Sequence, residues 1–214
     1  MKSFTLDALG IAAVDCPCGP LRNQRHNSIC DQWAEVVEEI GSHARLECYS
    51  AAHSTSTAEA WLDVKALGVP ELSTCLFDVT VRNPCNDRHV KLASKMSGAT
   101  AAKAEEDKAN RYPAVASAKR VVALSHELYG RLGDSAEHTL QLMAAVGTRR
   151  DHWDGRPPTN RLRRWRAVLD ATLHRGIVAQ LDAAWKGLPG HERGRSRRRN
   201  PQTLQEAPRG CLPR

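Results

Sequence analysis

The sequence has 214 residues, of which 41% are hydrophobic and 26% are charged, and its formal net charge is +7. This length allows one well-buried core with an appendage but is short for two full domains. No apolar run approaches the roughly 18 residues needed to span a bilayer, and seven scattered cysteines do not suit a disulfide framework. We therefore expect an intracellular protein with reduced thiols and no membrane contact.

Periodic apolar residues predict the elements of the first half of the chain. The segment 27–40 has apolar residues at helical spacing and is followed by Gly41 as a stop signal. A polar stretch at 53–57 predicts a loop. Three segments rich in β-forming residues predict strands over 44–50, 60–67 and 74–82.

The second half of the chain is mostly helical in its pattern. A helix, a strand and two further helices are predicted, in that order, over 97–112, 119–124, 134–146 and 160–185. Pro113 ends the first of these helices, and Asp134 followed by Glu137 is the capping-box pattern that opens the next one. Strands interleaved with helices predict an α/β fold, and a three-stranded meander followed by a helix and a strand predicts a mixed sheet.

Changes in composition divide the chain into four parts. Residues 1–24 form a lead-in, residues 25–148 hold the α/β core, and residues 149–187 form a C-terminal helical extension. Residues 188–214 are rich in Pro, Gly and Arg, and we expect a disordered basic tail. Such a tail attracts polyanions, although the same composition is typical of solvated tails and targeting signals.

Two aspartates stand inside apolar strand segments. Asp63 lies in Trp-Leu-Asp-Val and Asp78 in Leu-Phe-Asp-Val. A carboxylate in an apolar strand is costly to bury unless something compensates its charge. If the two strands are hairpin neighbours, the carboxylates lie together, and Mg²⁺ or Mn²⁺ would offset their repulsion. The alternative is that one or both aspartates end a strand and face solvent.

A lysine on the alanine-rich helix adds a third candidate. Lys108 and Tyr112 lie one turn apart on the same helix face. Such a lysine can reach a metal-bound water or a scissile phosphate, whereas the alternative is a solvated lysine beside Glu105 and Glu106. The sequence contains no phosphate-binding glycine loop, no nucleophile elbow and no paired aspartates of a polymerase palm.

Four residues near the N-terminus have almost the spacing of a zinc knuckle. They are Cys16, Cys18, His26 and Cys30, and the first pair is one residue tighter than usual. Together these three thiolates and one imidazole would supply the four ligands of a tetrahedral Zn²⁺ site. Cys30 also lies within the first predicted helix, which leaves the zinc site and a purely structural role open.

Six motifs follow one another in an order that resembles a known family. They are Cys16-Pro-Cys18-Gly19, Arg25-His26-Asn27, Leu62-Asp63-Val64, Phe77-Asp78-Val79-Thr80-Val81, Ala104-Glu105-Glu106-Asp107-Lys108-Ala109-Asn110-Arg111-Tyr112, and the segment from Val121 to Gly133. Together they resemble the C-terminal region of site-specific non-LTR retrotransposon proteins, which carries a restriction-like endonuclease of the PD-(D/E)XK superfamily. The resemblance runs from about residue 16 to residue 185. Each motif alone is weak, and six in the right order are fairly specific.

The resemblance implies a role for each candidate residue. Asp63 and Asp78 would bind the catalytic metal, with Glu47 as a helper in the first strand. Lys108 would replace the superfamily lysine that usually follows the second acid by two residues, where this chain has Thr80.

Basic residues would contact DNA in such an enzyme. Arg25, Arg111 and Tyr112 would face phosphates or support the fold. Further phosphate contacts are expected from Arg163, Arg164, Arg197, Arg198 and Arg199.

The resemblance also implies an activity. The protein would nick double-stranded DNA with Mg²⁺ or Mn²⁺ to prime reverse transcription, with element RNA and a reverse transcriptase module as partners and, in a eukaryote, a nuclear location.

The sequence also departs from the family pattern. Departures include Leu62 in place of a proline and a truncated zinc knuckle in which His26 would serve twice. A decayed, catalytically inactive nucleic-acid-binding remnant is therefore the alternative. A third reading is an ordinary α/β domain whose tail alone binds nucleic acid.

Overall fold

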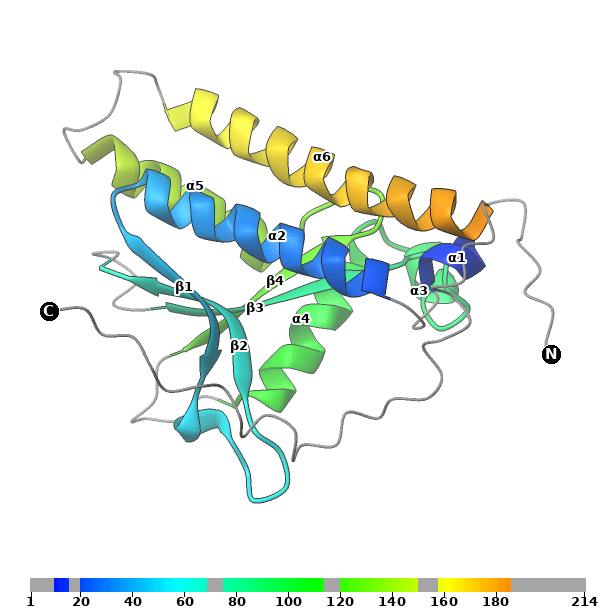
Figure 1. The fold of residues 1–214 in the computed structure, drawn as a ribbon, viewed down its shortest axis with the longest axis horizontal. Helices are drawn as coiled ribbons and strands as arrows, with labels where there is room; N and C mark the ends of the chain where they lie inside the picture. The colour runs from blue at the N-terminus through cyan, green and yellow to red at the C-terminus, as the bar shows by residue number, and fades with distance from the viewer. Residues whose placement is uncertain (1–9, 16–19, 69–74, 114–119, 150–157, 186–214) are drawn as a thin grey trace, which may run out of the picture.

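The centre of the molecule is a four-stranded mixed β-sheet with the order β1-β2-β3-β4 (Figure 1). This computed structural model describes residues 10–15, 20–68, 75–113, 120–149 and 158–185. The strands are β1 His43–Tyr49, β2 Trp61–Leu67, β3 Cys75–Arg82 and β4 Val121–Glu127. The helices in the described ranges are α1 Ile11–Asp15, α2 Pro20–Glu39, α3 Val90–Ala93, α4 Ala99–Arg111, α5 Asp134–Arg149 and α6 Pro158–Trp185, with a 3-10 turn at Ala51–His53.

The predicted α/β class, the order of the long elements and the mixed sheet are confirmed. Strands β1, β2 and β3 form an antiparallel meander, and β4 lies parallel to β3. Parallel neighbours need a crossover connection, and α4 lies within the connection from β3 to β4. Helix α2 begins at Pro20 rather than at residue 27, because proline suits the first turn, where its missing N–H leaves no intrahelical bond unmade.

Helices cover both faces of the sheet (Figure 1). Helix α4 packs on β3 and β4, whereas α2 and α5 pack on the opposite side. Helix α6 lies across α2 and α5 as an outer layer, and it contributes Trp165, Leu169 and Leu173 to the same hydrophobic cluster as Trp33 and Phe77. Burying one such side chain stabilises the fold by about 1.5–3 kcal/mol. None of the helices in the described ranges has the length and apolarity that a bilayer crossing requires.

The start of α5 is fixed by a residue from another helix. The helix begins at Asp134, as its sequence predicts, but the carboxylate of Glu105 on α4 accepts hydrogen bonds from the N–H and the hydroxyl of Ser135. Ser125 on β4 donates to the same carboxylate. A Cβ atom on Gly133 would collide with the side-chain oxygens of Ser125 and Glu105, so a larger residue there would displace this hydrogen-bonded pair. The predicted capping partner, Glu137, instead accepts hydrogen bonds from Arg166 on α6.

Candidate metal centre

The candidate site lies where β2 and β3 separate. Their backbone pairing runs from Ala66↔Cys75 to Val64↔Phe77 and stops there. Beyond this pair, the N–H of Val79 on β3 donates to Oδ2 of Asp63 at 2.6 Å, so the side chain of Asp63 takes the place of a backbone partner on β2. The carboxylate of Asp63 is therefore held between the two strands.

The neighbouring strand is also distorted at this level. Glu47 on β1 has a positive φ of 49° and falls between the pairs Leu46↔Val64 and Cys48↔Leu62. Leu62 and Val64 are two residues apart and would lie on the same face of a regular strand, yet they pack in different hydrophobic clusters. The strand thus twists across Asp63, which directs its carboxylate out of the regular pattern of alternating side chains.

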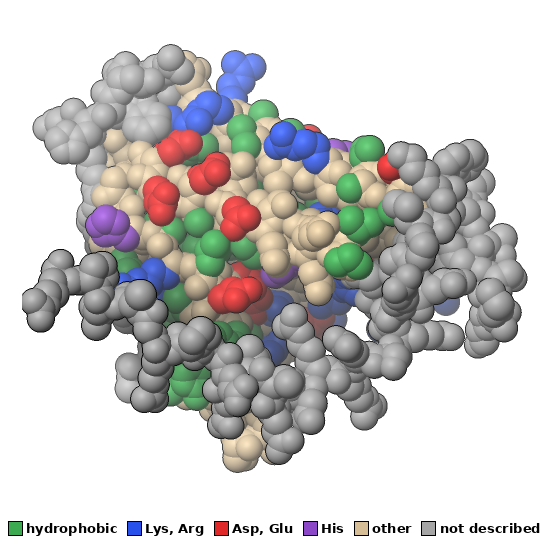
Figure 2. Space-filling model, viewed as in Figure 1, with side chains coloured by type: hydrophobic (Ala, Val, Ile, Leu, Met, Phe, Trp, Pro, Cys, Tyr) green, Lys and Arg blue, Asp and Glu red, His purple; other side chains and the backbone are tan. Residues whose placement is uncertain are grey.

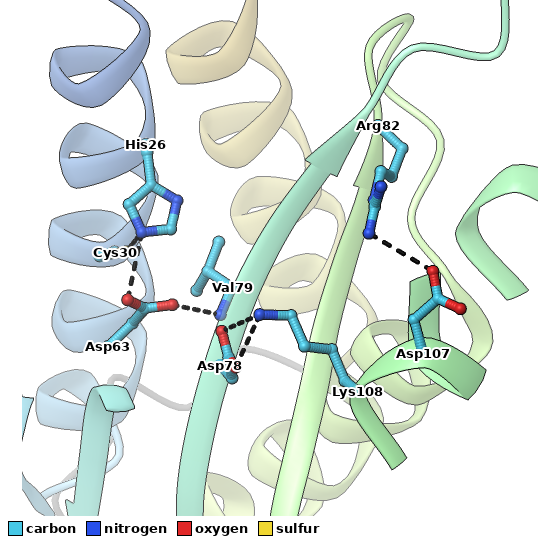
Figure 3. Close-up of polar contacts among 8 residues, drawn as sticks. All are labelled: His26, Cys30, Asp63, Asp78, Val79, Arg82, Asp107 and Lys108. Carbon is cyan, nitrogen blue, oxygen red and sulfur yellow. Dashed lines mark hydrogen bonds and ion pairs between the residues drawn. The ribbon is translucent and has the colours of Figure 1, made fainter. Parts of the chain in front are cut away.

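Helix α2 supplies two side chains to Asp63 (Figure 3). His26 and Cys30 are four residues apart and therefore lie on the same face of the helix. His26 Nε2 donates to Asp63 Oδ1 at 3.1 Å, and Cys30 Sγ lies 3.5 Å from the same nitrogen. The ligand atoms of these three residues all lie within 4.8 Å of one another, and the group could hold a metal ion.

Helix α4 supplies the partner of the second aspartate (Figure 3). Lys108 Nζ donates to both oxygens of Asp78, at 2.8 Å and 2.7 Å. The side chain of Asp78 is 7% exposed and that of Lys108 is 17% exposed, so this ion pair is largely removed from water. Asp78 is held from β3 and Lys108 from the crossover helix, and the pair links the sheet to α4.

The two carboxylates act on one another. Burial raises the pKa of Asp63, but the hydrogen bond and charge of His26 and the N–H of Val79 outweigh it and hold this pKa below its ordinary value. Burial raises the pKa of Asp78, and the charge of Asp63 adds to this rise although Lys108 opposes it. Two neighbouring carboxylates of this kind ionise together more readily when a further cation binds between them.

A tyrosine closes the site beside Asp78. Tyr112, one turn after Lys108, is buried, and burial together with the charge of Asp78 raises its pKa to about 12. Its ring meets the ring of His53 edge-on at 5.9 Å, and the guanidinium of Arg111 lies 5.1 Å from its centroid. Tyr112 therefore remains a phenol and supports the site from inside.

The structure brings together some of the predicted site residues and separates others. The candidate site contains five of them, namely Asp63, Asp78, Lys108, His26 and Cys30. Glu47 is exposed and is absent from the metal-ligand group found among the described residues, so its predicted helper role gains no support.

The predicted DNA-contacting residues differ in exposure. Arg25 is buried and donates to Gln180 on α6 at 2.5 Å, so of its two expected roles this position fits support of the fold and not contact with a phosphate. Arg111 and Arg163 are exposed, and Arg164 forms an ion pair with Glu39. The remaining predicted residues, Cys16, Cys18, Arg197, Arg198 and Arg199, lie outside the described residues.

Sequence reasoning missed the contact between His26 and Asp63. The residues are 37 positions apart, and the pairing of His26 with Cys30 at helical spacing was the one available signal. Sequence reasoning also missed Val79, because a backbone N–H becomes a site element only when a strand pair opens.

The outer face of α2 is acidic. Asp31, Glu35 and Glu38 are exposed at helical spacing, and Figure 2 shows acidic side chains gathered over α2 on the face that it views. This face would repel a polyanion, although the whole chain carries a net charge of +7.

Comparison of the sequence with models of protein families finds no match, and comparison with curated proteins finds none. The function is therefore inferred from the geometry of the site.

Proposed function

We propose that the protein is a divalent-metal-dependent DNA endonuclease with a restriction-endonuclease-like core. The observation that carries the proposal is the convergence of two interacting carboxylates from adjacent strands, Asp63 and Asp78, with the ammonium of Lys108 at 2.7 Å from Asp78. Support also comes from the antiparallel meander, the helical crossover and the parallel fourth strand that surround them.

The donor set of the two aspartates suits Mg²⁺ or Mn²⁺. These ions prefer carboxylate oxygens and retain several waters, and each oxygen of Asp63 and Asp78 has lone pairs beyond those used in the present hydrogen bonds. The bound metal would supply Lewis acidity and an activated water for attack on a phosphodiester. The residues of the chain hold the ion, orient it and carry compensating charge.

Lys108 has a separate task in this proposal. Its ammonium compensates Asp78 in the present arrangement, and a divalent ion bound by the aspartates would take over that compensation. Lys108 is then available to stabilise the negative charge that develops on the phosphate. Tyr112 supports Asp78 from the buried side and fixes the end of α4.

Double-stranded DNA is proposed to approach from the α4 side of the sheet. Exposed Arg111 lies there, next to Tyr112, and the acidic face of α2 disfavours the opposite approach. The proposal extends to nicking that primes reverse transcription, with element RNA and a reverse transcriptase module as partners and the nucleus as the location in a eukaryotic cell. The basic residues 197–199 would add contacts that do not depend on DNA sequence.

One observation favours a second candidate, an inactive nucleic-acid-binding remnant. Both carboxylates already have partners, since Asp63 accepts from His26 and Val79 and Asp78 accepts from Lys108. An internally satisfied network of this kind can stabilise a fold without binding a metal.

The test is nicking of supercoiled plasmid by the full chain with Mg²⁺. We expect nicking that EDTA abolishes and that is lost in Asp63→Asn and Asp78→Asn, because each removes a metal-binding carboxylate. Lys108→Ala should slow nicking by roughly 10²–10³, the usual cost of removing one donor that stabilises transition-state charge.

Exposed residues of the same types outside the site provide matched controls. Asp87 is exposed, and Lys103 on α4 forms surface ion pairs with Glu106 and Asp107, so Asp87→Asn and Lys103→Ala should nick like the wild type. Nicking that survives in Asp63→Asn or Asp78→Asn would refute the site assignment. Retarded but uncut plasmid would favour the inactive remnant.

A further inference from the structure

A second set of ligands adjoins Asp63 on the side of α2. We propose that His26, Cys30 and Asp63 form a binding site for a divalent transition-metal ion of the zinc type. This site is separate from the oxygen-lined pair of Asp63 and Asp78, and it shares Asp63 with that pair.

Two of the three ligand separations are close to those of a tetrahedral site, and the third pair of atoms, Cys30 Sγ and Asp63 Oδ1, lies within 4.8 Å. With Zn–S near 2.3 Å and Zn–N and Zn–O near 2.1 Å, tetrahedral ligands lie about 3.6 Å apart for S···N and about 3.4 Å apart for N···O. The observed values are 3.5 Å between Cys30 Sγ and His26 Nε2 and 3.1 Å between His26 Nε2 and Asp63 Oδ1. Small side-chain movements would therefore place all three atoms around one ion.

The backbone holds these ligands in place before an ion binds. His26 and Cys30 are one turn apart on a 20-residue helix, and Asp63 is fixed by the Val79 N–H. Binding of the ion would release two protons to water, the one that His26 Nε2 now donates to Asp63 and the thiol proton of Cys30. Cys30 is buried, whereas the side chains of His26 and Asp63 are 35% and 22% exposed, so an ion can enter from their side.

The chemistry of the donors selects the ion. A thiolate and an imidazole favour Zn²⁺ or Co²⁺ over Mg²⁺, which prefers oxygen ligands. Three protein ligands leave the fourth tetrahedral position for water or another group, as in catalytic zinc sites. This set replaces the two N-terminal cysteines of the predicted zinc knuckle with one carboxylate from the sheet.

Shared use of Asp63 has a consequence that rests on the proposed nuclease function. An ion bound by His26 and Cys30 would withdraw Asp63 from Asp78, and Zn²⁺ would then inhibit Mg²⁺-dependent nicking. The metal site itself does not depend on that function, because binding is measured without DNA.

The experiment is a titration of the full chain with Co²⁺, in which thiolate-to-cobalt charge transfer and visible d–d bands report a cysteine-bound tetrahedral ion. We expect saturation at one equivalent and displacement by Zn²⁺. Cys30→Ser should abolish the charge-transfer band. Asp63→Asn should weaken affinity by more than the roughly 10–100-fold that loss of an outer hydrogen-bonding partner costs.

Two control variants separate this site from the zinc knuckle. Cys75→Ser changes a buried cysteine in β3 and should leave the spectrum unchanged. The double variant Cys16→Ser/Cys18→Ser should also retain the spectrum and the affinity. Loss of the spectrum in that double variant, or full affinity in a folded Asp63→Asn, would overturn the proposal, and circular dichroism establishes that each variant is folded.

Inhibition of Mg²⁺-dependent nicking by Zn²⁺ is measured in a separate experiment. The Zn²⁺ concentration that halves nicking should match the Zn²⁺ affinity from the cobalt titration, and Cys30→Ser should raise it at least about tenfold. Metal binding without any nicking would contradict the nuclease function and leave the metal site standing. Nicking without a cobalt spectrum would contradict the metal site and leave the nuclease function standing.

Discussion

Two adjacent residues on α2 point to different partners. Arg25 reaches outward from the sheet to Gln180 on α6, and His26 reaches toward the sheet to Asp63. Successive residues of an α-helix lie about 100° apart around its axis, so one dipeptide can serve both sides of the helix. A Cβ atom on Gly176 would collide with the stem of Arg25, which shows how closely α6 approaches at this point.

A buried histidine near the site makes stability depend on pH. His126 on β4 is fully buried, and its Nε2 accepts a hydrogen bond from Trp33 Nε1 at 3.0 Å, so the imidazole is neutral in the native state. Burial, with a smaller contribution from the charge of His26, lowers the pKa of His126 from 6.5 to about 4. Because the unfolded chain binds this proton first, stability should fall as pH decreases from about 6.5 to about 4, by on the order of 3 kcal/mol.

Urea denaturation at a series of pH values measures this effect. The matched variant is His126→Gln, which offers Trp33 an oxygen near the position of Nε2 and does not titrate. The difference in unfolding free energy between wild type and variant should change across this pH window and stay constant above it. A difference that is the same at pH 7.5 and pH 4 would contradict the assignment.

At the scale of elements, α4 carries three residues, spaced three apart, that contact α5, β3 and the C-terminal end of α4 itself. Glu105 binds the start of α5, Lys108 binds Asp78 on β3, and Arg111 covers the ring of Tyr112. The helix thus fixes the site and the following helix at once. The motif that contains these residues combines a structural glutamate with a lysine of the candidate site.

Removal of the Glu105 carboxylate should destabilise the protein. It accepts hydrogen bonds from Ser125 and from both donors of Ser135, and bonds to a charged group contribute about 1.5–3 kcal/mol. We expect Glu105→Ala to lower the unfolding free energy by about 2–3 kcal/mol in urea denaturation. Glu106→Ala, on the exposed side of α4, should change it by less than about 0.5 kcal/mol. Equal losses for the two variants would contradict the capping role of Glu105.

The long elements could be predicted from the sequence because each has a periodic apolar face. The start of α2 could not, since residues 20–26 are mostly polar and two of them, Arg25 and His26, are held by α6 and β2. Helices α1 and α3 span only five and four residues, too few to show a periodicity.

The candidate site could be predicted in part. Asp63 and Asp78 stand out because a carboxylate in an apolar strand needs a partner, and Lys108 is part of a motif. The contact of His26 with Asp63 depends on how α2 packs on the sheet, which the spacing of residues does not define. The same holds for the opening between β2 and β3, where the side chain of Asp63 replaces a backbone partner.

At the scale of the whole molecule, the site lies where three layers meet. Helix α2 contributes His26 and Cys30, the sheet contributes Asp63 and Asp78, and α4 contributes Lys108 (Figure 3). Helix α6 clamps α2 from outside through Trp165, which is buried and donates to Glu39. The geometry of the site therefore depends on how these layers pack on one another.

The most direct test of the proposed function is the position of Mn²⁺ in crystals of the full chain. Anomalous scattering should reveal an ion bound by oxygens of both Asp63 and Asp78, at roughly the 2.1 Å typical of hard cations of this size, with Lys108 displaced from Asp78. Crystals of Asp78→Asn should lack that peak. An ion that binds elsewhere, or only at His26 and Cys30, would contradict the claim that the two aspartates share a catalytic metal.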